Sequence, residues 1–274
     1  MKLLIFGAKG MLGTDLMEVF SDLSPIGRDQ SNCDITNELQ VRRTLEEVKP
    51  TVVINAAAYT NVDGAESEEA LATQINGEAV GILARAAKKA KAVLVHYSTD
   101  YVFDGARKEG YREDDPVHPI GAYGRSKVEG ERQLALNSDA YYLLRTSWLY
   151  GKNGKNFVDT MLRLAREKSE IRVVNDQHGK STWTKDVALA TRFLLEHANH
   201  YPYGIYHAVN EEETTWYAFA CEIFSLSKSA VTVTPIQTKD YPTPTKRPAT
   251  SSLHNTKMPP LRSWQKALCA YLTE

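Results

Sequence analysis

Tyr123 and Lys127, near the middle of the 274-residue chain, are the pair of residues with the clearest potential for chemistry. They are four positions apart in a segment rich in Glu, Lys, Arg, Gln and Leu, so in a helix their side chains share one face. A lysine ammonium beside a phenol favours the phenolate and lowers a pKa that is ordinarily about 10. A tyrosine shifted in this way can exchange a proton with a substrate oxygen near neutral pH. Most such pairs are solvated neighbours on a helix, so the meaning of this one depends on the elements around it.

A glycine-rich turn at the start of the chain predicts a dinucleotide site. The apolar run Leu3–Phe6 is followed by glycines at positions 7, 10 and 13, and residues 11–20 have the apolar spacing of a helix. Glycines let the backbone approach a pyrophosphate, and a helix N-terminus offers free N–H groups. An ordinary strand-to-helix turn with a glycine cap is the alternative. The spacing is Gly-x-x-Gly-x-x-Gly rather than the usual Gly-x-Gly-x-x-Gly.

Two residues after the second expected strand, which ends near Ile26, bear on the choice of cofactor. An acidic residue about 20 positions beyond the glycines binds the ribose 2′-hydroxyl of NAD, whereas an arginine suits the 2′-phosphate of NADP. Arg28 and Asp29 supply both types. Arg28 slightly favours NADPH over NADH, and an exposed loop arginine is the alternative.

The remaining elements of the first half place further polar groups at one edge of a sheet. Strands are predicted at 51–55, 92–97 and 141–146, with helices at 71–90 and 125–136 between them. This alternation predicts a doubly wound parallel sheet. The small-sided stretch 55–60 and the hydroxyl of Thr99 follow strand ends, where open α/β sheets bind ligands. Asn76 is a polar residue within an alanine-rich segment, and we expect it on the helix surface.

From position 147 the pattern changes. Helices are predicted at 157–168, 186–197, 215–224 and 263–272, the last capped by Ser263, with strands at 171–174 and 204–209. Residues 241–260 are rich in Pro, Thr and Ser and are expected to be irregular. We therefore predict a Rossmann-like domain (1–147 and 183–209) with a smaller substrate-binding lobe (148–182 and 210–274).

Composition excludes several classes of function. A net charge of −1 gives no electrostatic basis for binding nucleic acid or an anionic membrane. The three cysteines have neither metal-ligand nor redox spacing, which indicates isolated thiols in a reducing compartment. No apolar stretch approaches the ~20 residues of a membrane span, so we expect a cytoplasmic protein.

Taken together, the glycine turn, Thr99, Tyr123 and Lys127 resemble the extended short-chain dehydrogenase/reductase family, and within it the reductases of nucleotide-linked ketosugars. The resemblance runs nearly from end to end. It includes the stretches 55–60, 62–66, 98–103, 145–151, 156–157, 176–179 and 247–248.

The resemblance implies hydride transfer from NADPH, with NADH as the alternative, to the C4 carbonyl of a dTDP-linked 6-deoxy-4-ketohexose, a step of polysaccharide biosynthesis. Tyr123 would donate the proton, and Lys127 would hold the nicotinamide ribose and keep the pKa of Tyr123 low. Thr99 would hydrogen-bond the reacting oxygen. Trp148 would line the sugar site, with a buried core tryptophan as the alternative. Asp100 and Asn156 complete the expected substrate contacts.

The same resemblance gives the cofactor positions: Gly7, Gly10, Met11, Leu12, Gly13, Arg28, Asp34, Ile35, Ala57, Ala58, Tyr59, Tyr123 and Lys127. Some family members bind Mg²⁺ between subunits, but no paired carboxylates here identify ligands. A monomer or homodimer is expected. The chain departs from the family pattern at Met11, Ser181 and His254, where Gln, Pro and Asp are usual.

Two alternatives stay open. The same fold serves as a non-catalytic, NADP-binding regulatory subunit of methionine adenosyltransferase, although Thr99, Tyr123 and Lys127 favour an enzyme. An epimerase or dehydratase of the extended family usually carries acidic residues after the hydroxyl residue. Asp100 has that position, but no Glu follows it.

Overall fold

Six parallel strands form the central sheet in the computed structural model, which describes residues 1–274. They are β1 (Leu3–Phe6), β2 (Ile26–Arg28), β3 (Val52–Asn55), β4 (Val93–Thr99), β5 (Tyr141–Thr146) and β10 (Gly204–His207). Their order is β10-β5-β4-β3-β1-β2, so the winding reverses between β1 and β3. Open α/β sheets bind ligands at such a reversal, beyond the carboxyl ends of the strands. The predicted doubly wound parallel sheet is confirmed.

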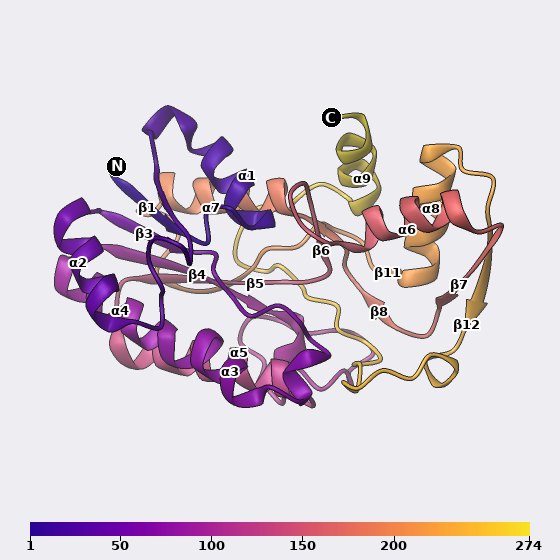
Figure 1. The fold of residues 1–274 in the computed structure, drawn as a ribbon, viewed down its shortest axis with the longest axis horizontal. Helices are drawn as coiled ribbons and strands as arrows, with labels where there is room; N and C mark the ends of the chain where they lie inside the picture. Colours follow the sequence, from indigo (N-terminus) through magenta and orange to yellow (C-terminus); the bar gives the residue numbers. More distant parts are fainter.

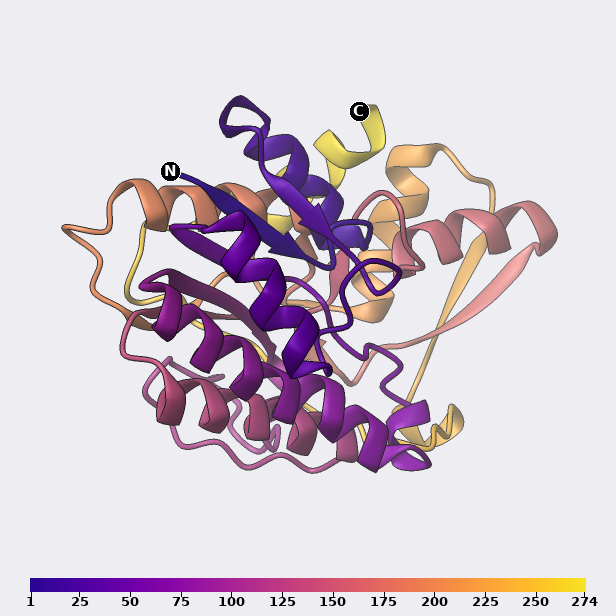
Figure 2. The ribbon, with the colours of Figure 1, turned by 60° about the vertical axis from the view of Figure 1, so that its left-hand side comes forward.

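Helices cover both faces of this sheet because its side chains alternate between two apolar cores. α1 (Met11–Val19) and α7 (Thr184–Glu196) lie on one face, and α2 (Glu38–Val48), α4 (Ala79–Ala90) and α5 (Ala122–Asn137) lie on the other, as Figures 1 and 2 show. Leu3 and Ile5 of β1 belong to the core under α1 and α7, whereas Leu4 and Phe6 belong to the opposite core.

The long helix expected at 71–90 is interrupted. It consists of α3 (Glu69–Thr73), a π-helical turn η3 (Gln74–Glu78) and α4. The expectation that Asn76 lies on the surface is wrong: it is buried within the π turn. Its amide accepts from the Tyr59 N–H at 2.9 Å and donates to the Tyr59 carbonyl and the Ser126 hydroxyl, both at 3.0 Å. The residue thus ties the end of β3 to α5.

A separate lobe follows, on the right of Figure 1, with a core of its own. Its main elements are α6 (Phe157–Glu167), α8 (Trp216–Ser227), α9 (Trp264–Thr273), and the parallel pair β7 (Glu170–Val174) and β12 (Thr232–Ile236). Two short pairs are β6 (Leu149–Tyr150) with β9 (Thr182–Trp183), and β8 (His178–Gly179) with β11 (Thr214–Thr215). The domain boundaries given above stay a prediction.

Most element types agree with the sequence, and the differences are local. Strands Leu3–Phe6 and Tyr141–Thr146 are found as predicted. α2, β12 and the short turns η1 (Ser21–Leu23), η2 (Gly64–Glu66), η4 (Asp100–Val102) and η5 (Thr238–Asp240) were not predicted. β2 begins at Ile26 instead of ending there, and Ser263 occupies the N-cap of α9 without a capping side-chain bond. No helix has both the length and the apolar character needed to cross a bilayer.

Candidate active site

A cavity of about 1650 Å³ lies at the carboxyl edge of the sheet, between the sheet and the lobe. Its walls come from the glycine turn, the ends of β3, β4 and β5, the start of α5, and the lobe elements α6, β7 and α8. Ligand pockets commonly measure about 300–1,000 Å³. The larger volume leaves room for a dinucleotide and a second, nucleotide-sized ligand together.

Most of the residues predicted to bind ligands line this cavity. They are Gly7, Gly10, Met11, Leu12, Asp34, Ile35, Ala57, Ala58, Thr99, Asp100, Tyr123, Lys127 and Trp148. Four predicted residues do not line it: Gly13, Arg28, Tyr59 and Asn156.

The glycine turn forms a cradle that a dinucleotide fits. Gly7 has φ +75°, and a Cβ on it would lie 2.5 Å from the Ala57 nitrogen, so only glycine lets the turn approach the end of β3. Gly10 is the N-cap of α1 and provides no capping side chain, so the first N–H groups of this helix are free to bind an anion. Gly13 does not line the cavity, but it allows α1 to pack against the glycine turn, because a Cβ there would lie 2.0 Å from the Gly7 carbonyl oxygen.

We predict that Gly13→Ala weakens NADPH binding by more than about tenfold, because α1 must move away from the turn and a reorientation of this kind costs at least ~1.4 kcal/mol. Gly10→Ala is the matched control. Its Cβ would lie 3.2 Å from the same carbonyl oxygen, so a smaller loss is expected. Fluorescence titration with NADPH measures both, and equal affinities for the two variants would contradict the prediction.

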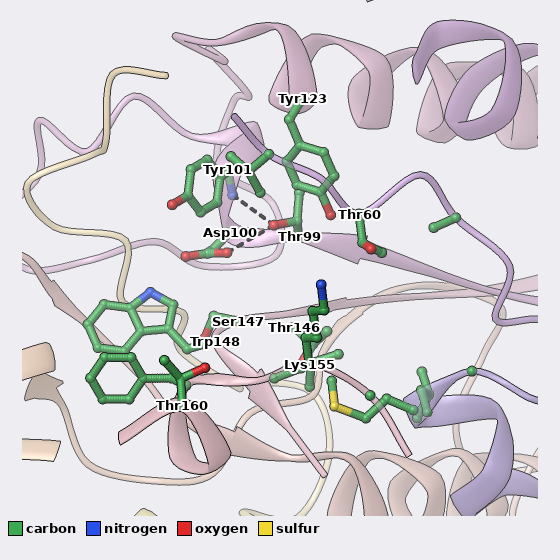
Figure 3. A pocket seen from close by; sticks show the side chains of 18 of the residues that line it. Thr60, Thr99, Asp100, Tyr101, Tyr123, Thr146, Ser147, Trp148, Lys155 and Thr160 are labelled. Carbon is green, nitrogen blue, oxygen red and sulfur yellow. Dashed lines mark hydrogen bonds between the residues drawn. The ribbon is translucent and has the colours of Figure 1, made fainter. Parts of the chain in front are cut away.

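The start of α5 carries Tyr123 and Lys127, and the end of β4 carries Thr99, so the three expected catalytic side chains line the same cavity. Figure 3 shows Tyr123 above Thr99. Lys127 is buried, and its Nζ donates to the Tyr97 carbonyl at 2.6 Å. Burial lowers the pKa of Lys127 to about 8. The Thr99 hydroxyl donates to Asp100 Oδ1 at 2.9 Å and accepts from the Tyr101 N–H at 3.2 Å.

The predicted lowering of the Tyr123 pKa is wrong for this structure. Burial raises the pKa of Tyr123 well above 10, and the nearby Asp100 and Tyr101 raise it further. The Thr99 hydroxyl opposes them, and Lys127 is not among the groups that shift this pKa. The reason is that the Lys127 ammonium is directed to the Tyr97 carbonyl. Tyr123 is therefore protonated at neutral pH, which is the state that a proton donor requires.

Several buried polar atoms at the strand ends have no partner within the protein. They include Ser98 Oγ, Asp100 Oδ2 and Thr146 Oγ1, all from residues that line the cavity. Burial raises the pKa of Asp100 to about 6. Since buried polar groups are normally hydrogen-bonded, Ser98 Oγ and Thr146 Oγ1 can each take a further polar partner at this edge.

Trp148 forms an aromatic wall of the cavity together with Trp216. It is only partly buried, has φ 46°, and stacks on Trp216 with ring centroids 3.7 Å apart. The alternative of a buried core tryptophan is therefore wrong. Contact between Trp148 and a sugar stays a prediction.

Arg28, Asn156 and Tyr59 do not line the cavity and have contacts within the protein, and their contacts with ligands stay a prediction. Arg28 Nη1 donates to the Gly27 carbonyl at 3.1 Å, and Lys9 and Asp29, 2.6 Å apart, line the cavity nearby. Asn156 caps α6, accepting from the Asp159 N–H at 3.0 Å. The Tyr59 hydroxyl donates to Glu68 at 2.6 Å on the surface.

The structure has no group of three or more His, Cys, Asp or Glu side chains arranged to hold a metal ion. No metal ion enters the mechanism below.

Comparison with known proteins shows which family this chain belongs to. A family model described as the RmlD substrate binding domain matches residues 1–274. A dTDP-4-dehydrorhamnose reductase of Burkholderia thailandensis is 42% identical over 272 residues, covering 93% of this chain and 91% of that protein. Crystal structures of dTDP-4-dehydrorhamnose reductases from Clostridium acetobutylicum (41% identity) and from Bacillus anthracis in complex with NADP (38%) each have a TM-score of 0.96. Each covers 100% of this chain and 99% of its own.

Proposed function

We propose that this chain, which belongs to the RmlD family of dTDP-4-dehydrorhamnose reductases, reduces the C4 ketone of dTDP-4-dehydro-L-rhamnose to give dTDP-L-rhamnose. The observation that carries the proposal is the meeting of Thr99, Tyr123 and Lys127 in a cavity that also contains the glycine cradle. A nucleotide sugar and a reduced nicotinamide dinucleotide together account for the size of that cavity.

The chemistry follows from the placement of three side chains. The reduced nicotinamide, when bound, supplies the hydride. Tyr123 donates its phenolic proton to the oxygen that becomes negative, and its high pKa ensures that it carries that proton. Thr99 rotates its hydroxyl from Asp100 to the same oxygen and donates a hydrogen bond to it, and loss of such a donor typically costs about 3 kcal/mol. The Lys127 ammonium holds the ribose hydroxyls of the cofactor and adds positive charge to the site.

The alternatives are less well supported. A non-catalytic subunit would not need Thr99, Tyr123 and Lys127 to line one cavity together with the glycine cradle. A dehydratase would need a second acid after Asp100, and the next residue is Tyr101, whose hydroxyl is bonded to Arg247.

The direct test is the oxidation of NADPH or NADH measured at 340 nm with dTDP-4-dehydro-L-rhamnose, with the product identified by mass spectrometry. Turnover that depends on the nucleotide sugar supports the reductase. Folded protein that binds NADPH but turns over with neither cofactor would support the regulatory subunit instead.

For the cofactor, we propose that NADPH is preferred and that Lys9, not Arg28, contacts the 2′-phosphate. Lys9 lines the cavity and its ammonium lies beside Asp29, at the position where the adenosine ribose of a dinucleotide is expected. We predict that Lys9→Met raises KM for NADPH about five- to tenfold, since a charge-assisted hydrogen bond is worth ~1–2 kcal/mol, and leaves KM for NADH nearly unchanged.

Lys88→Met is the matched control for Lys9→Met, because Lys88 forms an exposed ion pair of similar length, 2.7 Å, with Asp139 and does not line the cavity. It is expected to leave both KM values unchanged. Equal effects of Lys9→Met on the two cofactors would contradict the contact with the 2′-phosphate.

A further inference from the structure

Two stretches that the sequence analysis singled out, 62–66 and 247–248, have no part in the chemistry above, yet they meet beside Tyr123. Arg247 lies in the irregular segment between η5 and α9. Its guanidinium donates to Asp63 Oδ2 at 2.8 Å and to the Tyr101 hydroxyl at 3.0 Å. The Arg247 side chain is 18% exposed, so both bonds are largely shielded from water.

The Asp63 end of this arrangement is itself fixed. Asp63 Oδ1 accepts from the Thr245 N–H at 3.3 Å, and the Thr245 hydroxyl donates to the Val62 carbonyl at 2.8 Å. The C-terminal segment is thus bonded to the 62–66 loop on both sides of Lys246. Arg247 is held by contacts that do not involve a ligand.

The same loop holds the start of the helix that carries Tyr123. The N-cap of α5 is Gly121, which has no side chain to cap the helix, and Glu66 Oε1 accepts from the Ala122 N–H at 3.0 Å in its place. A Cβ on Gly121 would lie 2.8 Å from Thr245 Cγ2, so the C-terminal segment packs directly against this end of α5.

Tyr101 connects Arg247 to Tyr123. Its ring meets the Tyr123 ring edge to face, with centroids 5.9 Å apart and planes at 80°, and Figure 3 shows the two rings on the same side of the cavity. The main chain of Tyr101 also packs against α5, next to Tyr123. A Cβ on Gly124 would lie 2.2 Å from the Tyr101 carbonyl oxygen. A Tyr101 ring held at its hydroxyl therefore restricts the orientations open to the Tyr123 phenol.

We propose that Arg247 is a positioning residue for the proton donor: anchored by Asp63, it fixes the Tyr101 ring, and the Tyr101 ring fixes the phenol of Tyr123 over Thr99. The inference rests on the proposed function, since it assigns to these residues the alignment of the donor in that reaction. It gives the 62–66 and 247–248 stretches a shared role in turnover, separate from binding of the cofactor.

The kinetic test compares Arg247→Met and Tyr101→Phe with wild type. We expect kcat to fall about tenfold in Arg247→Met, because misplacing a reacting group by ~1 Å can cost ~10²-fold. Tyr101→Phe keeps the ring and loses one hydrogen bond, so a fall of about two- to tenfold is expected. KM for NADPH stays unchanged in both. In a Tyr123→Phe background, Arg247→Met causes no further fall in kcat, because no donor is left to align.

The control is Arg192→Met, which removes a two-point ion pair of the same kind, with Asp22 at 2.6 and 2.9 Å, remote from the cavity. It is expected to leave kcat unchanged. Two results would overturn the proposal. One is a rise in KM for the nucleotide sugar with kcat unchanged, which would make Arg247 a substrate-binding residue. The other is the same loss of kcat with and without the Tyr123 hydroxyl.

A readout without turnover separates this inference from the proposed function. In protein labelled with 3-fluorotyrosine, the ¹⁹F signal that disappears in Tyr123→Phe belongs to Tyr123. That signal is expected to shift in Arg247→Met and in Tyr101→Phe, and to stay in place in Arg192→Met. An unshifted signal in Tyr101→Phe, the variant that disturbs packing least, overturns the positioning role. An inactive wild type that shows the expected shifts overturns only the proposed reaction.

Discussion

Tyr123→Phe is expected to lower kcat about 10²–10⁴-fold, the range for loss of general acid catalysis, while NADPH binding stays close to that of wild type. The Tyr123 side chain is half-buried and lines the cavity, so the substitution removes one oxygen without changing the packing of the ring. The edge-to-face contact with Tyr101 does not depend on that oxygen. Turnover of dTDP-4-dehydro-L-rhamnose and fluorescence titration with NADPH measure the two quantities separately.

Tyr203→Phe provides the comparison for Tyr123→Phe. Tyr203 is 47% exposed and packs against Tyr142, outside the cavity. Turnover of the Tyr203→Phe variant is therefore expected to equal that of wild type. Near-normal turnover of Tyr123→Phe would remove Tyr123 from the mechanism. A fall in turnover accompanied by an equal loss of NADPH affinity would make Tyr123 a cofactor-binding residue instead of the proton donor.

The parts of the fold that local patterns encode were predicted well. Leu3–Phe6 and Tyr141–Thr146 are short apolar runs, and both lie between two helical layers, where side chains on each face of a strand are buried. The glycine spacing at 7, 10 and 13 indicated a close approach of backbones, and each of the three positions excludes or crowds a side chain. Apolar strands and glycine turns can be predicted because they depend on residues close together in the sequence.

The parts that were missed depend on contacts between distant segments. The pKa of Tyr123 is raised mainly by burial and further by Asp100 and Tyr101, while the Lys127 ammonium that was expected to lower it is bonded to the Tyr97 carbonyl, 30 positions earlier. Asn76 is buried because the Tyr59 main chain and Ser126 supply its partners. One signal was available in the sequence: Asn76 precedes Gly77, where a Cβ would meet Glu129 of α5 at 2.7 Å. A polar residue beside a glycine in an alanine-rich helix can mark such a close contact.

Arg28 and Asn156 show a different limit, because neither lines the cavity and both side chains have contacts within the protein. Their contacts with ligands stay a prediction. Asn156 precedes a helix, and asparagine at an N-cap satisfies free N–H groups of the first turn. An N-cap role for Asn156 could have been predicted from the sequence alone. Lys9 was not among the predicted cofactor residues, although it lies inside the glycine motif.

Lys127→Met is expected to reduce kcat/KM by about 10²-fold or more without lowering the free energy of unfolding at pH 7. The ammonium is 3% exposed and bonded to one carbonyl, and burial is the main cause of its lowered pKa, about 8 against an ordinary 10.5. A methionine of similar length fills the same space without a charge that must be removed from water. Function is lost, because no group remains to hold the ribose hydroxyls, while stability is retained or increased.

The dependence of stability on pH distinguishes this explanation from a packing effect. Because the folded protein binds the Lys127 proton less tightly than the unfolded chain does, the cost of burying the charge is fully present below pH 8. It decreases as pH rises from about 8 toward 10.5, and wild type gains up to ~1.4 kcal/mol per pH unit relative to Lys127→Met. Urea unfolding of the two proteins between pH 7 and pH 9.5 measures the difference. A difference that does not change with pH would show that the folded protein and the unfolded chain bind the Lys127 proton equally tightly, and burial of the charge would then not explain the gain in stability.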